Sequence, residues 1–188
     1  MKKKTLYSIK KILSDKDIED LIKLHDKYSV LGRNRYKTNE RVQYNNLNDV
    51  IYTDITDVAH TIPALKKLDV KGHKRLRTYF VKYFEGSYAV PHKDVGHHDK
   101  GTTRLTVIDT SKDLKGGHPV YYKRGKGEHK RNMYPIVEYN RKGFTTTHKF
   151  SLMHGVSKVK KGWRLVLVTW YREKNESTRT VKRIKKTT

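Results

Sequence analysis

The sequence contains no cysteine among its 188 residues. This absence excludes disulfide bonds, thiolate nucleophiles and zinc or iron–sulfur centres held by cysteine. The sequence also lacks any apolar run that approaches the roughly 20 residues of a membrane span, so we expect no membrane partner. Both absences fit a protein of the cytoplasm, or of the host cytoplasm if the chain is virus-encoded.

Acidic residues are few in comparison with basic ones. The chain has 19 Asp and Glu against 43 Lys and Arg, which gives a formal net charge of +24. The electrostatic field of such a charge attracts polyanions, such as nucleic acid, an anionic membrane or an acidic protein. The charge alone does not indicate which of these is the partner. A lysine-rich surface without any binding role is the alternative.

The pattern of apolar residues predicts helices first and strands later. Ser14 precedes an amphipathic segment with acidic residues in its first turn, which predicts a capped helix over 15–28. We expect a long polar loop over 29–50 and a second helix over 54–67, broken or bent at Pro63.

From Arg75 onward, short runs rich in aromatic and β-branched residues are separated by turn residues. This pattern is typical of an antiparallel β-sandwich or barrel. We therefore divide the chain into N-terminal helices and a loop packing on the barrel (1–74), a β-rich core (75–172) and a basic, flexible tail (173–188). The tail carries Arg179, Lys182, Arg183, Lys185 and Lys186.

The segment "PHKDVGHHDKG" contains two His-x-Asp pairs. On an extended strand, residues two apart point the same way, so such a pair presents an imidazole beside a carboxylate. A second histidine from a neighbouring strand would complete three ligands on one face of an octahedron, the arrangement of non-haem Fe(II) oxygenases. His92 and Asp94 directly follow a predicted strand, and "FSLMHGV" offers His154 as the third ligand.

The rival pair is His97 with Asp99. Gly96 and the polar residues around it place this pair in a turn, where the alternation argument fails. We therefore predict His92, Asp94 and His154 as the metal ligands, and His97 and His98 as loop residues near the site.

Arg164 stands inside the apolar strand "WRLVLVTW". A buried arginine without a partner is costly, so an anion is expected beside it, and a carboxylate held by two parallel hydrogen bonds is the natural choice. Trp163 and Trp170, on either side of it, are expected to be packing residues.

These residues resemble the Fe(II)/2-oxoglutarate-dependent dioxygenases, most closely the prolyl-4-hydroxylase-like branch. The resemblance is carried by "YFEGSYAVPHKD", the pair Gly116-Gly117 and "HGVSKVKKGWRLVLVTW", and it covers residues 75–172. It implies an α+β fold, with supporting N-terminal helices on a double-stranded β-helix of the jelly-roll or cupin type. The chain departs from the family pattern at Ala89, where a tyrosine is usual and Tyr88 lies one place away, and at His118-Pro119 after the glycine pair.

The resemblance further implies Fe(II) as cofactor, with 2-oxoglutarate and O2 as co-substrates. Arg164 would meet the far carboxylate of 2-oxoglutarate, Tyr83 would be a second donor, and Thr106 would help to hold the co-substrate. The implied activity is hydroxylation of a C–H bond in a macromolecular substrate, first of all a peptidyl side chain such as proline.

Two alternatives remain open for the function. The first is an oxygenase acting on a nucleobase of DNA or RNA, and the second is a basic nucleic-acid-binding module without catalysis. The segment "YYKRGKGEHKRNMYP" has basic residues interleaved with tyrosines. It could bind a phosphate backbone through its basic side chains and stack bases on its tyrosines, or it could be a solvated hairpin without a binding role. The candidate substrate or polyanion contacts are Tyr88, Arg104, Lys123, Arg124, Lys126, Lys130 and Arg131. Arg172 is a weaker candidate for the second arginine of base-demethylating relatives.

Overall fold

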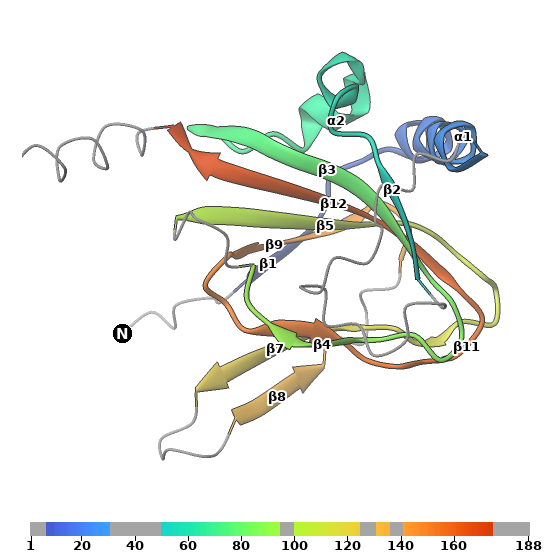
Figure 1. The fold of residues 1–188 in the computed structure, drawn as a ribbon, viewed down its shortest axis with the longest axis vertical. Coiled ribbons are helices and arrows are strands. Elements are labelled where there is room, and N and C mark those ends of the chain that lie inside the picture. The colour runs from blue at the N-terminus through green and yellow to red at the C-terminus, as the bar shows by residue number, and fades with distance from the viewer. Residues whose placement is uncertain (1–6, 31–49, 95–99, 125–130, 136–140, 175–188) are drawn as a thin grey trace, which may run out of the picture.

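The structure is a computed structural model. It describes residues 7–30, 50–94, 100–124, 131–135 and 141–174, with the backbone alone described at 30, 123–124 and 131–135. Two antiparallel sheets face each other across the core, and the helices cover the outer face of the larger sheet (Figure 1). Within the described residues, no helix is long and apolar enough to cross a membrane.

The larger sheet has six strands in the order β1-β9-β5-β12-β3-β2. Their bounds are β1 Tyr7–Lys11, β2 Val50–Asp54, β3 His73–Tyr83, β5 Gly101–Thr110, β9 Phe144–Lys149 and β12 Arg164–Glu173. β12 lies in the middle and is paired along its length with β3 and β5. Because both of its faces are covered, it reads as a nearly continuous apolar run.

The smaller sheet has four strands in the order β4-β10-β7-β8. Their bounds are β4 Ala89–His92, β7 Pro119–Arg124, β8 Arg131–Pro135 and β10 His154–Val156. A third, two-stranded sheet joins β6 Lys115–Gly116 to β11 Val159–Lys161.

The first helix, α1, spans Asp15–Val30 and confirms the prediction of a capped helix. Ser14 and Asp17 form a reciprocal cap: the Asp17 amide donates to Ser14 Oγ at 3.2 Å, and Asp17 Oδ2 accepts from the Ser14 amide at 2.8 Å. Ile18 and Leu21 are buried against the larger sheet. The apolar stripe of α1 therefore fixes it to the outer face of the sheet.

The predicted second helix over 54–67 is wrong in its first part. Asp54 ends strand β2, Ala59–Thr61 is a short 3-10 helix, and only α2, Pro63–Lys67, is α-helical. Pro63 begins this helix because proline lacks an amide hydrogen, which the first helical position does not need. The segment expected to hold only helices and a loop also gives strands β1 and β2 to the larger sheet.

Two hydrophobic cores follow from the alternation of side chains along β3 and β12. Tyr83 and Val166 belong to the core between the sheets, which also includes Ala89 and Tyr121 from the smaller sheet. Phe80 and Leu167 point the other way, into the core beneath α1 and α2. The space between the sheets is the one that receives the candidate ligands.

Candidate metal centre

His92 and His154 face each other across two paired strands. They are directly opposite in the antiparallel pairing of β4 with β10, and their ring centroids lie 4.5 Å apart. Gly155 permits this pairing, because a Cβ at that position would lie 2.7 Å from the Ala89 carbonyl oxygen of β4. The sequence prediction that His154 comes from a neighbouring strand is therefore confirmed.

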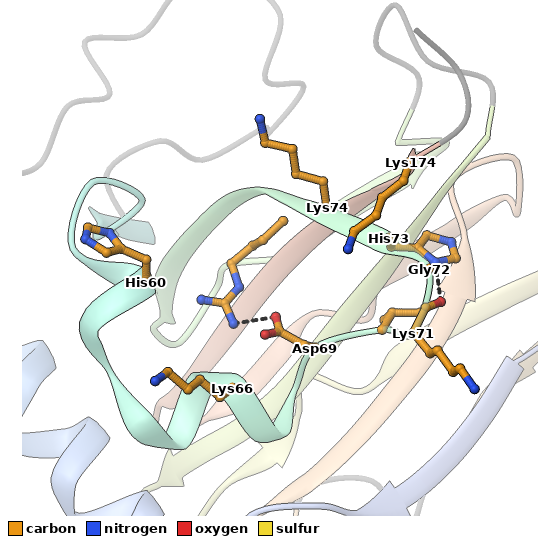
Figure 2. A pocket seen from close by; sticks show the side chains of 10 residues that line it. His60, Lys66, Asp69, Lys71, Gly72, His73, Lys74 and Lys174 are labelled. Atoms are coloured by element: carbon orange, nitrogen blue, oxygen red, sulfur yellow. Dashed lines mark hydrogen bonds and ion pairs between the residues drawn. The ribbon is translucent and has the colours of Figure 1, made fainter. Parts of the chain in front are cut away.

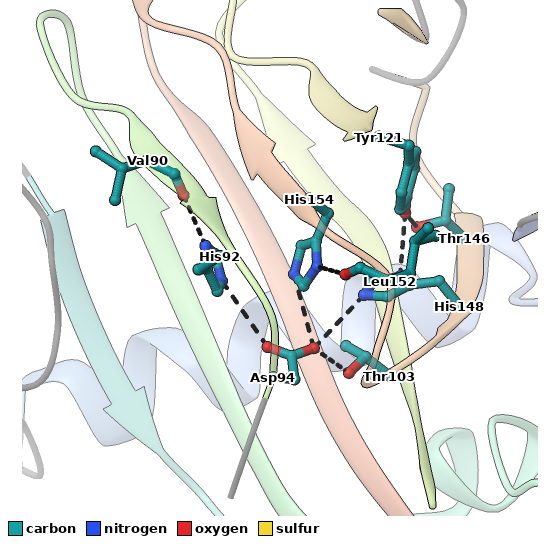
Figure 3. A network of polar contacts seen from close by, with 9 residues as sticks. All are labelled: Val90, His92, Asp94, Thr103, Tyr121, Thr146, His148, Leu152 and His154. Carbon is teal, nitrogen blue, oxygen red and sulfur yellow. Dashed lines mark hydrogen bonds and ion pairs between the residues drawn. The ribbon is translucent and has the colours of Figure 1, made fainter. Parts of the chain in front are cut away.

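Asp94 lies two residues beyond the end of β4, with its amide donating to the Phe150 carbonyl at 3.1 Å. Its Oδ1 is 3.8 Å from His92 Nε2, and its Oδ2 is 3.6 Å from His154 Nε2. The ligand atoms of His92, Asp94 and His154 all lie within 4.8 Å of one another. This separation allows a single metal ion to contact all three (Figure 3).

The hydrogen bonds of both imidazoles leave Nε2 free to bind a metal. His92 Nδ1 lies 2.7 Å from the Val90 carbonyl, and His154 Nδ1 lies 2.9 Å from the Leu152 carbonyl. A carbonyl oxygen only accepts, so each Nδ1 carries the hydrogen and each neutral ring has its lone pair on Nε2. Such backbone contacts are the usual way in which a protein orients a metal-binding histidine.

The electrostatics of the site favour the protonation states that a metal requires. Burial, together with the neighbouring His148 and His92 imidazoles, lowers the pKa of His154 to about 4, so the ring is neutral at pH 7. Burial acts to raise the pKa of Asp94, but the adjacent His148 and His154 imidazoles and the Thr103 hydroxyl outweigh it and bring it to about 2. Two imidazole nitrogens and one carboxylate suit a divalent transition metal.

Arg164 and Tyr83 lie next to each other where β12 begins and β3 ends. They are directly opposite in the β12–β3 pairing, and both are buried, with Arg164 fully so. The Arg164 Nη1 donates to the Gly117 carbonyl. Gly116 and Gly117 have φ of 77° and 68°, and a Cβ on Gly116 would lie 2.1 Å from the Lys158 carbonyl, so this turn requires glycine. The structure thus brings together the two residues predicted to hold a carboxylate.

Thr106 and Arg104 are placed away from this space. Thr106 is opposite Leu167 on the face beneath α1, and its hydroxyl bonds to Thr145 Oγ1 at 2.8 Å. Arg104 donates from Nη1 to the Leu68 carbonyl at the end of α2, at 2.6 Å. Their positions do not support the predicted contacts with co-substrate or polyanion, because the register turns both side chains outward.

The other predicted substrate contacts are only partly placed. Tyr88 is half-buried just before β4. Lys123 and Arg124 lie in β7, and Arg131 of β8 is opposite Arg124. The side chains of these three residues are not among those that the structure describes. Lys126, Lys130, His97 and Asp99 lie outside the described residues, as does the tail beyond Lys174.

His148 is a site residue that sequence reasoning missed. It lies on β9 with its side chain fully buried, and its Nε2 is 3.5 Å from Asp94 Oδ2. Its ring centroid is 4.3 Å from that of His154. The alternation of Thr146 and His148 in "FTTTHK" was the available signal, because it places both side chains on one face of a strand.

A cavity of about 800 Å³ lies at the turn between α2 and β3 (Figure 2). Its one carboxylate, Asp69, is taken by Arg75, whose Nη2 lies 2.6 Å from Oδ1. We call it the basic cavity, because its remaining charged or titratable lining residues are all basic: His60, Lys66, Lys71, His73, Lys74 and Lys174. His73 is opposite Glu173 at the end of β12.

Several solved structures share this architecture. A prolyl-4-hydroxylase from Pseudomonas putida superposes with a TM-score of 0.63 at 12% identity, covering 89% of this chain and 92% of that one. The chain has the fold of the 2-oxoglutarate-Fe(II) oxygenases. A prolyl hydroxylase from Trichoplax adhaerens, in complex with a peptide fragment of hypoxia inducible factor, gives 0.64 at 13%, covering 89% and 84%.

A third structure, HygX from Streptomyces hygroscopicus with nickel, 2-oxoglutarate and hygromycin B bound, gives a TM-score of 0.60 at 12% identity, covering 91% of this chain and 84% of that one. No protein-family model matches the sequence, and no curated protein does. The solved structures alone confirm the resemblance to the prolyl-4-hydroxylase-like branch, and they confirm it at the level of the double-stranded β-helix fold.

Proposed function

We propose that the protein is an Fe(II)/2-oxoglutarate-dependent dioxygenase that hydroxylates a C–H bond of a macromolecular substrate, first of all a prolyl-type side chain of a peptide. The observation that carries this proposal is the convergence of His92, Asp94 and His154 with both Nε2 lone pairs available. A binding module without a metal gains nothing from three buried or half-buried ligands with these orientations.

The residues of the site divide into two groups by role. His92, Asp94 and His154 would hold the metal, while Arg164 and Tyr83 would receive the far carboxylate of 2-oxoglutarate. With Fe(II), 2-oxoglutarate and O2 bound, such a centre supplies the oxidation of C–H to C–OH, coupled to conversion of 2-oxoglutarate to succinate and CO2. The chain itself orients the ligands and excludes water from the space around Arg164.

The exposure of the ligands indicates the side from which a substrate approaches. The His92 side chain is 36% exposed, whereas those of Asp94 and His154 are 6% and 10% exposed. A substrate would therefore reach the centre past His92. The peptide-bound and prolyl hydroxylase neighbours support a peptide, since they have the same fold.

The test is to incubate the protein with Fe(II), 2-oxoglutarate and proline-containing peptides, and to measure succinate together with peptide mass. The proposal predicts succinate formation and a mass increase of one oxygen atom on a peptide. His92→Ala should abolish both, while Lys93→Ala, an exposed neighbour between two ligands, should preserve them. Lack of succinate from the unaltered protein in the presence of Fe(II) would contradict the assignment.

A second candidate, an oxygenase acting on a nucleic acid, is favoured by the basic cavity and the net charge of +24. Phosphate groups are the anions that such a lysine-lined cavity would take. The charge-removing variant Lys71→Gln/Lys74→Gln/Lys174→Gln should then weaken oligonucleotide binding more than Lys10→Gln/Lys16→Gln/Lys23→Gln, which removes equal charge from β1 and α1. Equal weakening by both would refute a specific role for the cavity.

The non-catalytic binding module and the cytoplasmic location stay predictions. The module would bind oligonucleotides without producing succinate, so the same two assays separate it from both oxygenase candidates.

A further inference from the structure

A third imidazole, outside the predicted ligand set, contacts the metal centre. The His148 side chain is fully buried, and its Nε2 has no hydrogen-bond partner among the described residues, although Asp94 Oδ2 lies 3.5 Å away. Its ring packs against His154 with centroids 4.3 Å apart. A buried polar nitrogen aimed at a ligand carboxylate requires a function, because leaving it unsatisfied is destabilising.

The two oxygens of Asp94 have different surroundings (Figure 3). Oδ2 accepts a hydrogen bond from the Thr103 hydroxyl, faces His148 and lies 3.6 Å from His154 Nε2, whereas Oδ1 lies 3.8 Å from His92 Nε2. Thr103 and His148 are directly opposite in the β5–β9 pairing, so the two side chains approach Oδ2 from neighbouring strands. Two side chains of the larger sheet therefore approach Oδ2, while Oδ1 faces His92 of the smaller sheet.

The other nitrogen of the His148 ring is also fixed. The Tyr121 hydroxyl lies 3.1 Å from His148 Nδ1 and 2.9 Å from Thr146 Oγ1, to which it can donate. Tyr121 is itself buried, and its ring packs edge-on against His148 with centroids 5.2 Å apart. When the hydroxyl hydrogen turns from Thr146 to His148 Nδ1, the ring carries its own hydrogen on Nε2, where it can donate to Asp94.

We propose that His148 is a positioning residue that, with Thr103, holds Asp94 Oδ2 away from the metal, so that Asp94 binds through Oδ1 alone. A carboxylate bound through one oxygen leaves three positions of an octahedral ion open. Two of these suit the keto acid end of 2-oxoglutarate and one suits O2. A carboxylate bound through both oxygens would occupy one of the three positions. This inference rests on the proposed function.

The geometry argues against His148 as a fourth ligand. Among the described residues, the set whose ligand atoms all lie within 4.8 Å of one another contains His92, Asp94 and His154 and does not include His148. His148 therefore contacts the centre through the carboxylate, and its removal should change how Asp94 binds rather than whether the metal binds.

The test compares His148→Phe, which keeps a ring but has no donor, with His148→Gln, whose amide can still donate to Oδ2. Co(II) serves as the metal probe, since its visible absorption reports coordination number, and it needs no turnover. We expect His148→Phe to bind Co(II) within about 10- to 100-fold of the unaltered protein, with a changed spectrum. We expect the KM for 2-oxoglutarate to rise about tenfold, and His148→Gln to restore both properties towards their original values.

Two results would overturn the inference. A His148→Phe spectrum and KM equal to those of the unaltered protein would show that the ring only fills space. A loss of Co(II) binding as complete as in His92→Ala, in both folded His148 variants, would make His148 a ligand instead. Failure of the unaltered protein to convert 2-oxoglutarate would refute the proposed function, while the Co(II) spectra alone would still decide the role of His148.

Discussion

Arg164 is the residue whose substitution should separate co-substrate binding from metal binding. It is fully buried, and its neighbour across the β12–β3 pairing is Tyr83 rather than a metal ligand. Arg164→Lys keeps the charge but removes the planar pair of donors that matches a carboxylate. We expect the KM for 2-oxoglutarate to rise by about tenfold, which corresponds to ~1.4 kcal/mol of lost binding.

The measurement is succinate formation at varied 2-oxoglutarate, with Fe(II) affinity measured in parallel. Fe(II) affinity should stay within about twofold, because the Arg164 guanidinium donates to the Gly117 carbonyl, which belongs to a different segment from the three ligands. A KM that does not change would show that the far carboxylate of 2-oxoglutarate binds elsewhere.

Candidate site residues were predictable where the local sequence alone indicates their chemistry. His92, Asp94, His154 and Arg164 lie in segments whose strand alternation and chemistry are readable without a fold. His148 was not predictable, because its contact with Asp94 depends on the pairing of β9 with β5. Thr106 was misplaced for the same reason: its face depends on strand register, which one sequence does not determine.

At the scale of elements, the close approach of β10 to β4 assembles the centre. Gly155→Ala would place a Cβ 2.7 Å from the Ala89 carbonyl oxygen, which is backbone and moves only if the two strands separate. We expect a stability loss of about 1–3 kcal/mol, since overpacking of a tight contact forces such shifts. Metal affinity should fall as well, because His92 and His154 would move apart.

Chemical denaturation and Fe(II) titration measure the two effects. A Gly155→Ala protein with unchanged stability and metal affinity would show that the β4–β10 pairing does not hold the ligands together.

The cap of α1 also links that helix to α2. Asp17 Oδ2 lies 2.7 Å from Lys67 Nζ, and the hydrogen bonds from Lys67 and Ser14 lower the pKa of Asp17 to about 2. Because this pKa is lower than in the unfolded chain, the contact stabilises the fold above about pH 4 and is lost as the pH falls through about 2. Asp17→Asn should cost about 1 kcal/mol at pH 7, since asparagine still caps but cannot pair with lysine.

Denaturation of both proteins at pH 7 and at decreasing pH measures this contribution. The difference in free energy of unfolding should shrink below about pH 4. A difference that stays constant down to pH 2 would contradict the charge-based explanation.

Elements with a local signal were predicted best. Helix α1 was predicted almost to its bounds, because its cap and apolar stripe are both local. The helix over 54–67 was overestimated: Asp54 is the last paired residue of β2, and a short 3-10 helix at Ala59–Thr61 precedes α2. Strand β1 was missed, since so short and exposed a segment is stabilised by distant contacts, its pairing with β9 and the stacking of Tyr7 on Tyr121.

At the scale of the whole molecule, the net charge of +24 should appear as salt-dependent binding of polyanions. Removal of residues 175–188 takes away five basic residues: Arg179, Lys182, Arg183, Lys185 and Lys186. If these contact phosphates, the slope of log affinity against log salt for a single-stranded oligonucleotide should fall in magnitude by up to about 3.5.

Fluorescence anisotropy at a series of salt concentrations gives this slope, with succinate formation as the control for an intact site. Equal slopes for the full-length and shortened proteins would show that the tail is not a binding arm.

The central claim is that two imidazoles and one carboxylate hold a ferrous ion that 2-oxoglutarate then chelates. Its most direct test is anaerobic addition of Fe(II) and 2-oxoglutarate while visible absorption is recorded. The unaltered protein and Lys93→Ala should develop a metal-to-ligand charge-transfer band that saturates at one iron per chain, and His92→Ala should not. Absence of the band from the unaltered protein, or its persistence in His92→Ala, would contradict the account.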